Sequence, residues 1–346
     1  MQETPVSTRG ESAASSASAS SASAGSSAAQ VTPSLLRGWP LPAAGADKYS
    51  RGAVLVIGGA RRTPGAVLLA GTAALRAGAG RLTLAVAESV AVQLAVMLPE
   101  AGVIGLRESA GGSLGPEGLD ALFEDLDAAD AVLIGPGLDD IDGTEALLRE
   151  LLRHEAERTA ERQPQNGGDS NGDDSNGESS ATVILDAYAL GCLPKLLDEL
   201  EPWAGRLILT PNPTEAAILL GRDVDLGGDD GGLAAAVVEI AEKYRAVVSC
   251  QGLIARPAGG DAPEAADRWE ITTGYGGLGT SGSGDILAGA IAGLRARGTT
   301  DAQAACWGTH LHAAAADRLA SRLGSLGFLA RELADELPPL MMELKA

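Results

Sequence analysis

Aromatic side chains are scarce in this chain, where Phe, Trp and Tyr together make up 3% of the 346 residues. Proteins that bind single-stranded nucleic acid stack the bases on aromatic rings, so this scarcity argues against that function. Cationic side chains are also a minority, with 26 Lys and Arg against 46 Asp and Glu and a formal net charge of -20. Because this charge repels a polyphosphate backbone, we expect no nucleic acid partner. A small phosphorylated ligand, held by local donors, remains compatible.

Cysteine is equally rare. Cys192, Cys250 and Cys306 are far apart, odd in number and without neighbouring histidines, which excludes a disulfide framework and a zinc site. The start of the chain lacks the basic segment and apolar run of a signal peptide. No uncharged apolar run is long enough to cross a membrane. These absences predict a cytoplasmic protein without a membrane partner.

Two segments have the composition of disordered chain. Residues 2–30 are nearly all Ser and Ala and cannot bury much apolar area, so we expect a disordered tail over residues 1–33. Residues 155–180 contain a run of Asn, Gly, Asp and Ser that does not match the ligand spacing of a calcium loop. We expect a flexible insertion there, and a smaller loop of the same type at 227–232. The remainder, residues 34–346, should form a single domain.

Between these segments, short apolar runs alternate with helical patterns. The runs rich in Val, Ile and Leu have the character of strands buried on both faces; they are Ala53–Ile57, Arg81–Val86, Ala131–Ile134, Thr182–Leu185, Arg206–Leu209 and Ala246–Cys250. The helical segments are Ala66–Ala77, Ser89–Leu98, Gly118–Leu126, Gly143–His154, Pro213–Leu220, Leu233–Tyr244, Ile286–Arg297 and Asp301–Leu323. This alternation predicts an α/β fold with three layers, α/β/α, and a mostly parallel central sheet.

Ligands of open α/β sheets bind beyond the carboxyl ends of the strands. The loops expected at that edge are rich in Gly, Pro, Asn and Asp, which is also the ordinary composition of turns. Taken together, however, these loops would bring four polar side chains to the same edge of the sheet, where they could form a site. The four residues are Asp186, Asn212, Glu215 and Asp285.

A glycine-rich segment, Gly279–Asp285, leads directly into the helical run Ile286–Arg297. Small residues let backbone N–H groups converge, and a helix start adds partial positive charge, so this segment suits an anion. Asp285 stands at its end. From the residues alone, its carboxylate either caps the helix or takes part in chemistry.

Several motifs in a fixed order make the sequence recognisable. They are Lys48-Tyr49-Ser50-Arg51-Gly52 before Val54–Gly59, Pro64-Gly65-Ala66, Ala73–Gly80, Ile134–Leu138, Leu185-Asp186-Ala187, Leu209–Pro213 and Gly284–Gly289. In these motifs, over about Lys48 to Pro338, the chain resembles the ADP- or ATP-dependent NAD(P)H-hydrate dehydratases. This family has a carbohydrate-kinase-like domain that repairs hydrated nicotinamide dinucleotides.

The resemblance implies a ribokinase-like fold and a catalytic domain over residues 34–346. It also implies that an adenine nucleotide, ADP or ATP, donates phosphate to the ring hydroxyl of NADHX or NADPHX, the hydrated dinucleotides. Loss of that phosphate restores NADH or NADPH, since phosphate leaves far more readily than hydroxide. Mg²⁺ is the implied cofactor, bridging the nucleotide phosphates. Bacterial relatives suggest a homo-oligomer.

Residue by residue, the resemblance makes Asp285 the base that accepts the hydroxyl proton. It places Ala66, Gly137 and Asn212, with Asp285, at the dinucleotide. It assigns Glu215 to the metal side, because Asn212-Pro213-Thr214-Glu215 fits the N-x-x-E pattern of the wider ribokinase-like group. The nucleotide side is implied to comprise Gln251, Gly252, Gly282, Ser283 and Gly284.

This chain departs from the family at three of these positions. Asn212 stands where family members commonly carry His, and an amide cannot carry charge. Gln251 replaces a family Lys, which removes a fixed positive charge from the nucleotide side. Ser283 replaces a Thr, a mild exchange of one hydroxyl residue for another.

Other readings remain open at this stage. A kinase of the same fold that phosphorylates a vitamin precursor or sugar needs the same anion site, and a non-catalytic nucleotide sensor is compatible with Asn212 and Gln251. His310 and His312 are two apart in a helical segment, so they face different sides and are expected to be core or surface residues. Arg61 and Arg62 are weak candidates for binding dinucleotide phosphates.

Overall fold

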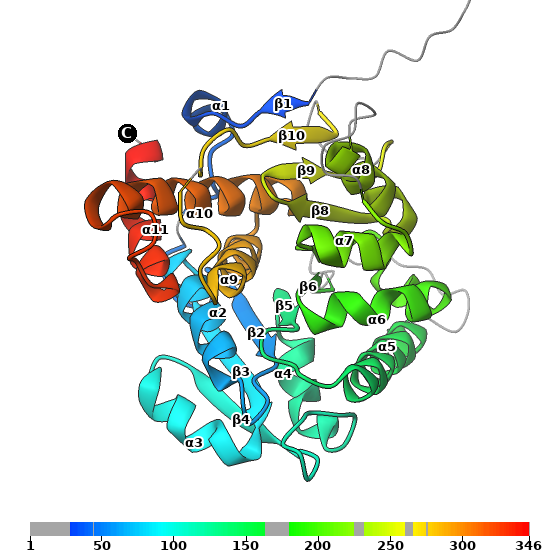
Figure 1. Ribbon diagram of the computed structural model, residues 1–346. Helices are drawn as coiled ribbons and strands as arrows, with labels where there is room; N and C mark the ends of the chain where they lie inside the picture. Colours follow the sequence, from blue (N-terminus) through cyan, green and yellow to red (C-terminus); the bar gives the residue numbers. More distant parts are fainter. Residues whose placement is uncertain are drawn as a thin grey trace, which may run out of the picture.

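A ten-stranded sheet forms the centre of the protein (Figure 1). The computed structural model describes residues 28–43, 45–162, 180–224, 232–259, 266–274 and 276–345. Along the sheet the order is β1-β10-β9-β8-β7-β6-β5-β2-β3-β4. Neighbouring strands are parallel except that β9 runs antiparallel to β8 and β10. The strands are β1 (Ala29–Gln30), β2 (Ala53–Ile57), β3 (Arg81–Ala87), β4 (Gly102–Leu106), β5 (Ala131–Ile134), β6 (Thr182–Leu185), β7 (Leu207–Leu209), β8 (Ala246–Cys250), β9 (Leu253–Ala255) and β10 (Arg268–Glu270).

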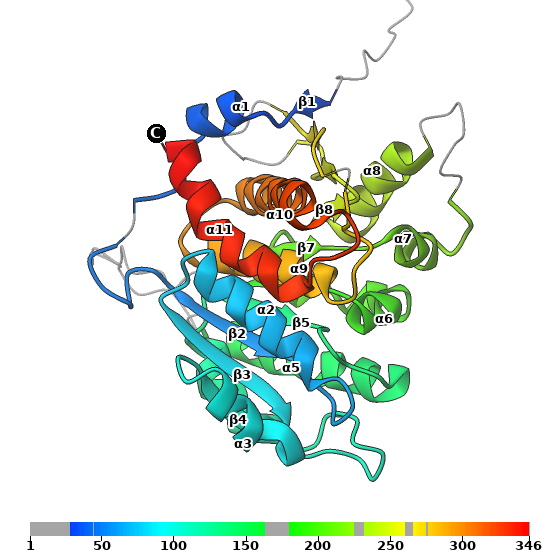
Figure 2. The same cartoon turned by 60° about the vertical axis from the view of Figure 1, so that its left-hand side comes forward.

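Helices cover both faces of the sheet, as Figure 2 shows, which confirms the predicted three-layer α/β architecture. One face packs against α1 (Pro33–Gly38), α2 (Pro64–Arg76), α3 (Glu88–Met97), α9 (Ser283–Ala296), α10 (Asp301–Leu323) and α11 (Ala330–Lys345). The other packs against η1 (Leu119–Leu122), α4 (Phe123–Asp127), α5 (Ile141–Arg162), α6 (Tyr188–Leu196), η2 (Leu197–Glu199), η3 (Glu201–Trp203), α7 (Pro213–Leu220) and α8 (Gly232–Tyr244). None of the described helices is long and apolar enough to cross a bilayer.

The predicted strands are all present, with ends shifted by at most a residue, because their apolar runs are buried on both faces. The sequence did not reveal β1, β4, β9 and β10, which lie toward the two ends of the sheet. In β4, Gly102 and Gly105 are exposed and interrupt the apolar pattern. Helices α6 and α11 were not predicted either, because both contain proline, which disfavours the interior of a helix. The prolines are Pro194 in α6 and Pro338 and Pro339 in α11.

Both segments expected to be disordered overlap with ordered elements of the described structure. Of the tail expected over residues 1–33, residues 1–27 lie outside the described residues. In the remainder, β1 pairs with β10 and Val31 is buried, so the fold includes residues before 33. The insertion expected at 155–180 begins as the last turns of α5. There Glu155 is buried and forms an ion pair of 2.8 Å with Arg206. Residues 163–179 and 225–231 lie outside the described residues.

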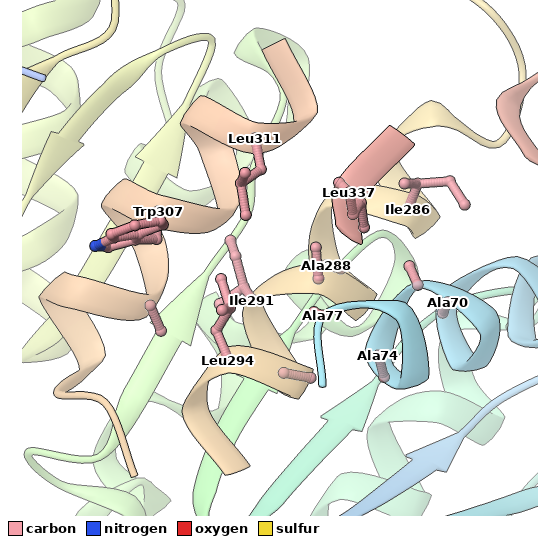
Figure 3. Close-up of a cluster of buried hydrophobic side chains, with 14 of the residues drawn as sticks. Ala70, Ala74, Ala77, Ile286, Ala288, Ile291, Leu294, Trp307, Leu311 and Leu337 are labelled. Atoms are coloured by element: carbon pink, nitrogen blue, oxygen red, sulfur yellow. The ribbon is translucent and has the colours of Figure 1, made fainter. Parts of the chain in front are cut away.

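Two parallel helices, α2 and α9, pack with their backbones in contact (Figure 3). A Cβ atom added to Gly289 would lie 2.1 Å from the Ala70 carbonyl oxygen, and one added to Gly293 would lie 2.3 Å from that of Ala74. Only glycine permits this approach. Because residue number increases in the same direction along both helices, the N-termini of α2 and α9 lie at the same end of the layer.

Candidate active site

The loops after β2 and β5 are fastened to each other by backbone hydrogen bonds. Gly59 N–H donates to the Pro136 carbonyl (2.8 Å), and Ala60 N–H donates to that of Gly137 (2.9 Å). From β2 the chain moves outward through β3 and β4, and β5 then returns to the other side of β2. This reversal of strand order is where open α/β sheets bind ligands. The carboxyl edge of the sheet beside these loops, which we call the crevice, is therefore the candidate site.

Ala66 and Gly137, both predicted at the dinucleotide, are neighbours in this crevice. A Cβ atom added to Gly137 would lie 3.1 Å from the Ala66 Cβ and 2.4 Å from the Thr63 carbonyl oxygen, and φ of Gly137 is 72°. Gly137 must therefore be glycine. Beside them, Gly65 at the start of α2 has no heavy atom within 4 Å of an added Cβ, so its backbone faces open space.

The start of α9 has the same open character. At Gly284, an added Cβ would meet nothing within 4 Å. Gly282, the N-cap residue of α9, adopts φ 87° and directs the chain into the helix. The N–H groups of Gly284 and Asp285 belong to the first helical turn and precede the residues that can bond within the helix, so they are available to an anion.

Ser283 does not share this role. Its Oγ lies 2.9 Å from Nε2 of His312 on α10, and its N–H donates to the Thr280 carbonyl. Both residues are buried, and burial lowers the pKa of His312 to about 4, so the imidazole is neutral. The hydroxyl and the N–H of Ser283 are thus both engaged within the protein, and the nucleotide-side roles of Gly282, Ser283 and Gly284 stay predictions.

Three carboxyl groups gather at the carboxyl ends of the strands. Burial raises the pKa of Asp285 to about 6. Burial also raises the pKa of Asp186 to about 7, with the charges of Asp285 and Glu215 adding to it and a hydrogen bond from Thr210 Oγ1 (2.8 Å) opposing it. The pKa of Glu215 is raised by burial as well. Groups that titrate near neutral pH in a crevice are suited to proton transfer.

Tight packing fixes the position of Asp186. A Cβ atom added to Gly135 would lie 1.9 Å from the Asp186 carbonyl oxygen, so the β5 loop runs against the end of β6. The next residue, Ala187, has φ 51°, a conformation that side chains rarely adopt. Such strain, held in place by surrounding structure, is common at functional sites.

Asn212 and Glu215 form a capping box at the start of α7. The Asn212 Oδ1 accepts from Glu215 N–H (2.9 Å), and the Glu215 Oε2 accepts from Asn212 N–H (2.8 Å). This arrangement explains the N-x-x-E spacing in purely structural terms. The cap uses Glu215 Oε2 and Asn212 Oδ1, but it does not use the other carboxylate oxygen of Glu215 or the side-chain NH₂ of Asn212. The expected roles of Glu215 toward a metal and of Asn212 toward the substrate therefore stay predictions.

Gln251 and Gly252 form the two-residue turn between β8 and β9. Cys250 pairs with Leu253 across the hairpin, and both turn residues have positive φ, 48° and 83°. These values define a turn whose twist suits a hairpin, which accounts for Gly252 without a ligand. A nucleotide role for this pair remains a prediction.

A cavity of about 270 Å³ adjoins the glycine-rich segment before α9. It is lined by Gly277, Gly279, Thr280, Ser325, Leu326 and Phe328. The last three residues connect α10 to α11 and belong to no motif, so no pattern in the sequence indicated that they would lie beside this segment.

Two arginines and two histidines were also considered from the sequence. Arg61 forms an ion pair of 2.5 Å with Glu108, whereas Arg62 is exposed. His310 and His312 are both buried and do not share a site, as expected from their spacing. Within the described residues no three His, Cys, Asp or Glu side chains converge on a point that could hold a metal ion.

Comparison with known proteins gives the same family as the motifs. A family model described as NAD(P)H-hydrate dehydratase matches residues 54–157 and 173–339. The chain is 42% identical over 319 residues to an ADP-dependent (S)-NAD(P)H-hydrate dehydratase from Xanthomonas campestris pv. campestris, covering 91% of this chain and 96% of that relative.

Solved structures agree on the fold. The ADP/ATP-dependent NAD(P)H-hydrate dehydratase from Bacillus subtilis, co-crystallized with ATP/Mg²⁺, superposes with a TM-score of 0.65 at 26% identity, covering 92% of this chain and 99% of that one. A ribokinase-like superfamily protein from Enterococcus faecalis gives 0.67 at 22% identity, covering 92% and 97%. The fold is therefore ribokinase-like, and the chain belongs to the NAD(P)H-hydrate dehydratase family.

Proposed function

We propose that the protein uses ADP or ATP to dehydrate NADHX and NADPHX to NADH and NADPH. The observation that carries this proposal is the pairing of the half-buried Asp285 carboxyl group, whose pKa is raised to about 6, with the open backbone of Gly284 beside it. A base and an anion cradle in adjacent residues suit phosphoryl transfer to a hydroxyl. The Xanthomonas relative is named for ADP and this reaction, and the Bacillus enzyme for both nucleotides.

In this proposal, the two parallel helices divide the substrates. The start of α2, with Ala66 and the adjoining Gly137, receives the hydrated dinucleotide, while the start of α9 receives the phosphate to be transferred. Asn212, exposed at the head of α7, completes the dinucleotide side with its free amide group. Because α2 and α9 are in backbone contact, the two reactants are held at a fixed separation.

Asp285 then acts on the ring hydroxyl. As the hydroxyl oxygen bonds to phosphorus, its proton passes to the Asp285 carboxylate, and the bond from phosphorus to the nucleotide oxygen breaks. The ring C–O bond breaks next and releases phosphate, and loss of a proton from the neighbouring ring carbon restores the double bond. Amides of Gly284 and Asp285 stabilise the charge on the transferred phosphoryl oxygens.

Mg²⁺ fits the donor set of this crevice. Glu215, Asp186 and Asp285 offer only oxygen ligands, and their charges influence one another in the structure. Magnesium is usually held by one or two carboxylates together with substrate phosphates rather than by a cage of side chains. Glu215 is the residue we assign to it, and the bound ion would neutralise charge on the nucleotide phosphates.

The nucleotide itself is assigned to the remaining groups of the crevice. The 270 Å³ cavity lined by Gly279, Thr280 and Phe328 suits the adenine base, because an aromatic ring and exposed backbone can contact a flat heterocycle. Gln251 and Gly252 are proposed to lie toward the phosphates. We further propose that the protein is a cytoplasmic homo-oligomer, because the dinucleotides it would repair are soluble metabolites.

A single assay tests the reaction. Purified protein with NADHX and Mg²⁺ should regenerate NADH, followed by its absorbance, and release one phosphate for each NADH, with ADP and ATP compared as donors. A kinase of the same fold would consume nucleotide without forming NADH. A sensor would bind nucleotide without consuming it. Either result would overturn the proposal, and the Asp285→Asn variant serves as the control for contaminating activity.

A further inference from the structure

The Lys48–Gly52 motif lies at the amino ends of the strands, on the edge opposite the candidate active site. Gly80, just before β3, donates its N–H to the Gly52 carbonyl (3.0 Å). A Cβ atom added to Gly80 would lie 1.8 Å from the Lys48 carbonyl oxygen, so glycine is required for this contact. The motif and the turn before β3 therefore fold against each other, and nothing in the catalytic proposal uses them.

A cavity of about 270 Å³ opens at this edge, between the first residues of β2 and β3. The seven residues of β3 separate it from the carboxyl edge by roughly 20 Å, so it is distinct from the catalytic crevice. Its polar lining consists of Lys48, Arg81, Thr83, Glu100 and Asp125.

Two cations at this cavity have no acidic partner within the described residues. Neither Lys48 nor Arg81 forms an ion pair there, although the chain has a net charge of -20 and Arg61, for example, is paired. The Nε atom of Arg81 is buried and has no hydrogen-bond acceptor in the described structure. Leaving a charged donor unsatisfied is unfavourable, and an anionic group in the cavity would satisfy it.

Further groups beside the cations restrict the kind of anion. Tyr49 is 65% exposed, and Lys48 Nζ and Arg81 Cζ lie over its ring, 5.2 Å and 5.3 Å from the centroid. An exposed ring next to cations can stack a flat base. Within the cavity, the Asp125 carboxylate accepts from Thr83 Oγ1 (2.9 Å) through one oxygen. Carboxylates at such sites accept hydrogen bonds from ribose hydroxyls.

We propose that this cavity binds a nucleoside monophosphate. Its phosphate contacts Lys48 and Arg81, its ribose hydroxyls donate to Asp125 and Glu100, and its base lies against Tyr49. The site stands on the amino edge of the sheet and does not depend on the function proposed for the carboxyl edge.

Calorimetric titration of the full chain with AMP, and separately with ribose 5-phosphate, tests the proposal. Lys48→Ala and Arg81→Gln should each weaken AMP binding tenfold or more, because each removes a charged contact to phosphate. Tyr49→Leu should weaken AMP fivefold or more and leave ribose 5-phosphate unchanged, since only AMP has a base to stack. Arg107→Gln, which removes an exposed arginine outside the cavity, is the matched control and should bind as the wild type does.

The Gly284→Ala background separates this cavity from the catalytic crevice. In that background, AMP binding that depends on Lys48 and Arg81 should persist. The proposal is overturned if AMP does not bind there at millimolar concentration, or if the Lys48 and Arg81 variants bind AMP like the control. Lys48 is exposed, so Lys48→Ala keeps the test valid even where Arg81→Gln disturbs folding, which melting temperatures would reveal.

Discussion

Gly284 and Gly289 belong to the same helix, but a methyl group would fit at Gly284 and would clash at Gly289. At Gly284 it would have no heavy atom within 4 Å, whereas at Gly289 it would lie 2.1 Å from the Ala70 carbonyl oxygen. Packing within the protein therefore requires glycine at 289 but not at 284. A ligand that approaches the Gly284 backbone would account for glycine there.

This contrast gives the first prediction. Gly284→Ala should fold with an unchanged or slightly higher melting temperature, because alanine favours the helix and meets no clash. Affinity for ADP should fall tenfold or more, since the methyl group would occupy the phosphate position. Gly289→Ala is the matched control, and its melting temperature should drop. Wild-type ADP affinity in Gly284→Ala would contradict the anion cradle.

The second prediction concerns the base. Asp285→Asn preserves shape and removes proton acceptance, so turnover should fall roughly a hundredfold or more while nucleotide affinity changes little. In the unmodified protein, kcat/KM should decline as pH falls below about 6, where the Asp285 carboxyl group becomes protonated. A helix cap would be served almost as well by Asn, so near-normal turnover would show that Asp285 only caps α9.

The third prediction uses Asp186, whose pKa rises from 3.8 to about 7 on folding. The folded state holds this proton more tightly, so the stability it contributes is present at acid pH and is lost as pH rises through about 7. Asp186→Asn removes that dependence and keeps an acceptor for Thr210 Oγ1. Melting temperatures at about pH 5 and pH 8 should therefore differ less in the variant than in the wild type. Equal differences would place the titration elsewhere.

The fourth prediction addresses the turn after β8. If Gln251 lies toward the nucleotide phosphates, Gln251→Lys should tighten ADP or ATP binding and make the affinity more sensitive to salt. Gln251→Asn is the control, because Asn followed by Gly suits the hairpin turn and adds no charge. It should raise stability slightly and leave nucleotide affinity unchanged. Affinity of the lysine variant that is indifferent to ionic strength would remove Gln251 from the nucleotide side.

The sequence predicted most of the sheet, and it indicated the edge that holds the candidate site, because both depend on local patterns. Buried apolar runs marked the parallel strands, and glycines after β2 and β5 marked the loops that meet at the crevice. Contacts between distant segments left no such pattern. The hydrogen bond between Ser283 and His312 joins two helices, and its consequence, a hydroxyl turned away from the crevice, could not be read from the glycine-rich segment.

A second limit on predicting the site is that the same residue types form turns and helix caps as well as ligand-binding loops. Gln251-Gly252 reads equally well as a ligand loop or as a hairpin turn, and only the positive φ of both residues identifies the turn. Asn212 and Glu215 present the same ambiguity, since a capping box and a metal-side motif share one spacing. In both cases the family resemblance supplied a function that the residue pattern by itself did not require.

The backbone contact between α2 and α9 also determines which parts of the crevice can adapt. Sliding one helix along the other would drive the Ala70 and Ala74 carbonyl groups into the α9 backbone, so the two helix starts move as one rigid block. To bind a ligand of another length, the protein would have to change the segments that face these two helix starts. Directed evolution toward altered dinucleotides should accordingly keep Gly289 and Gly293 constant and diversify the loops after β6 and β7.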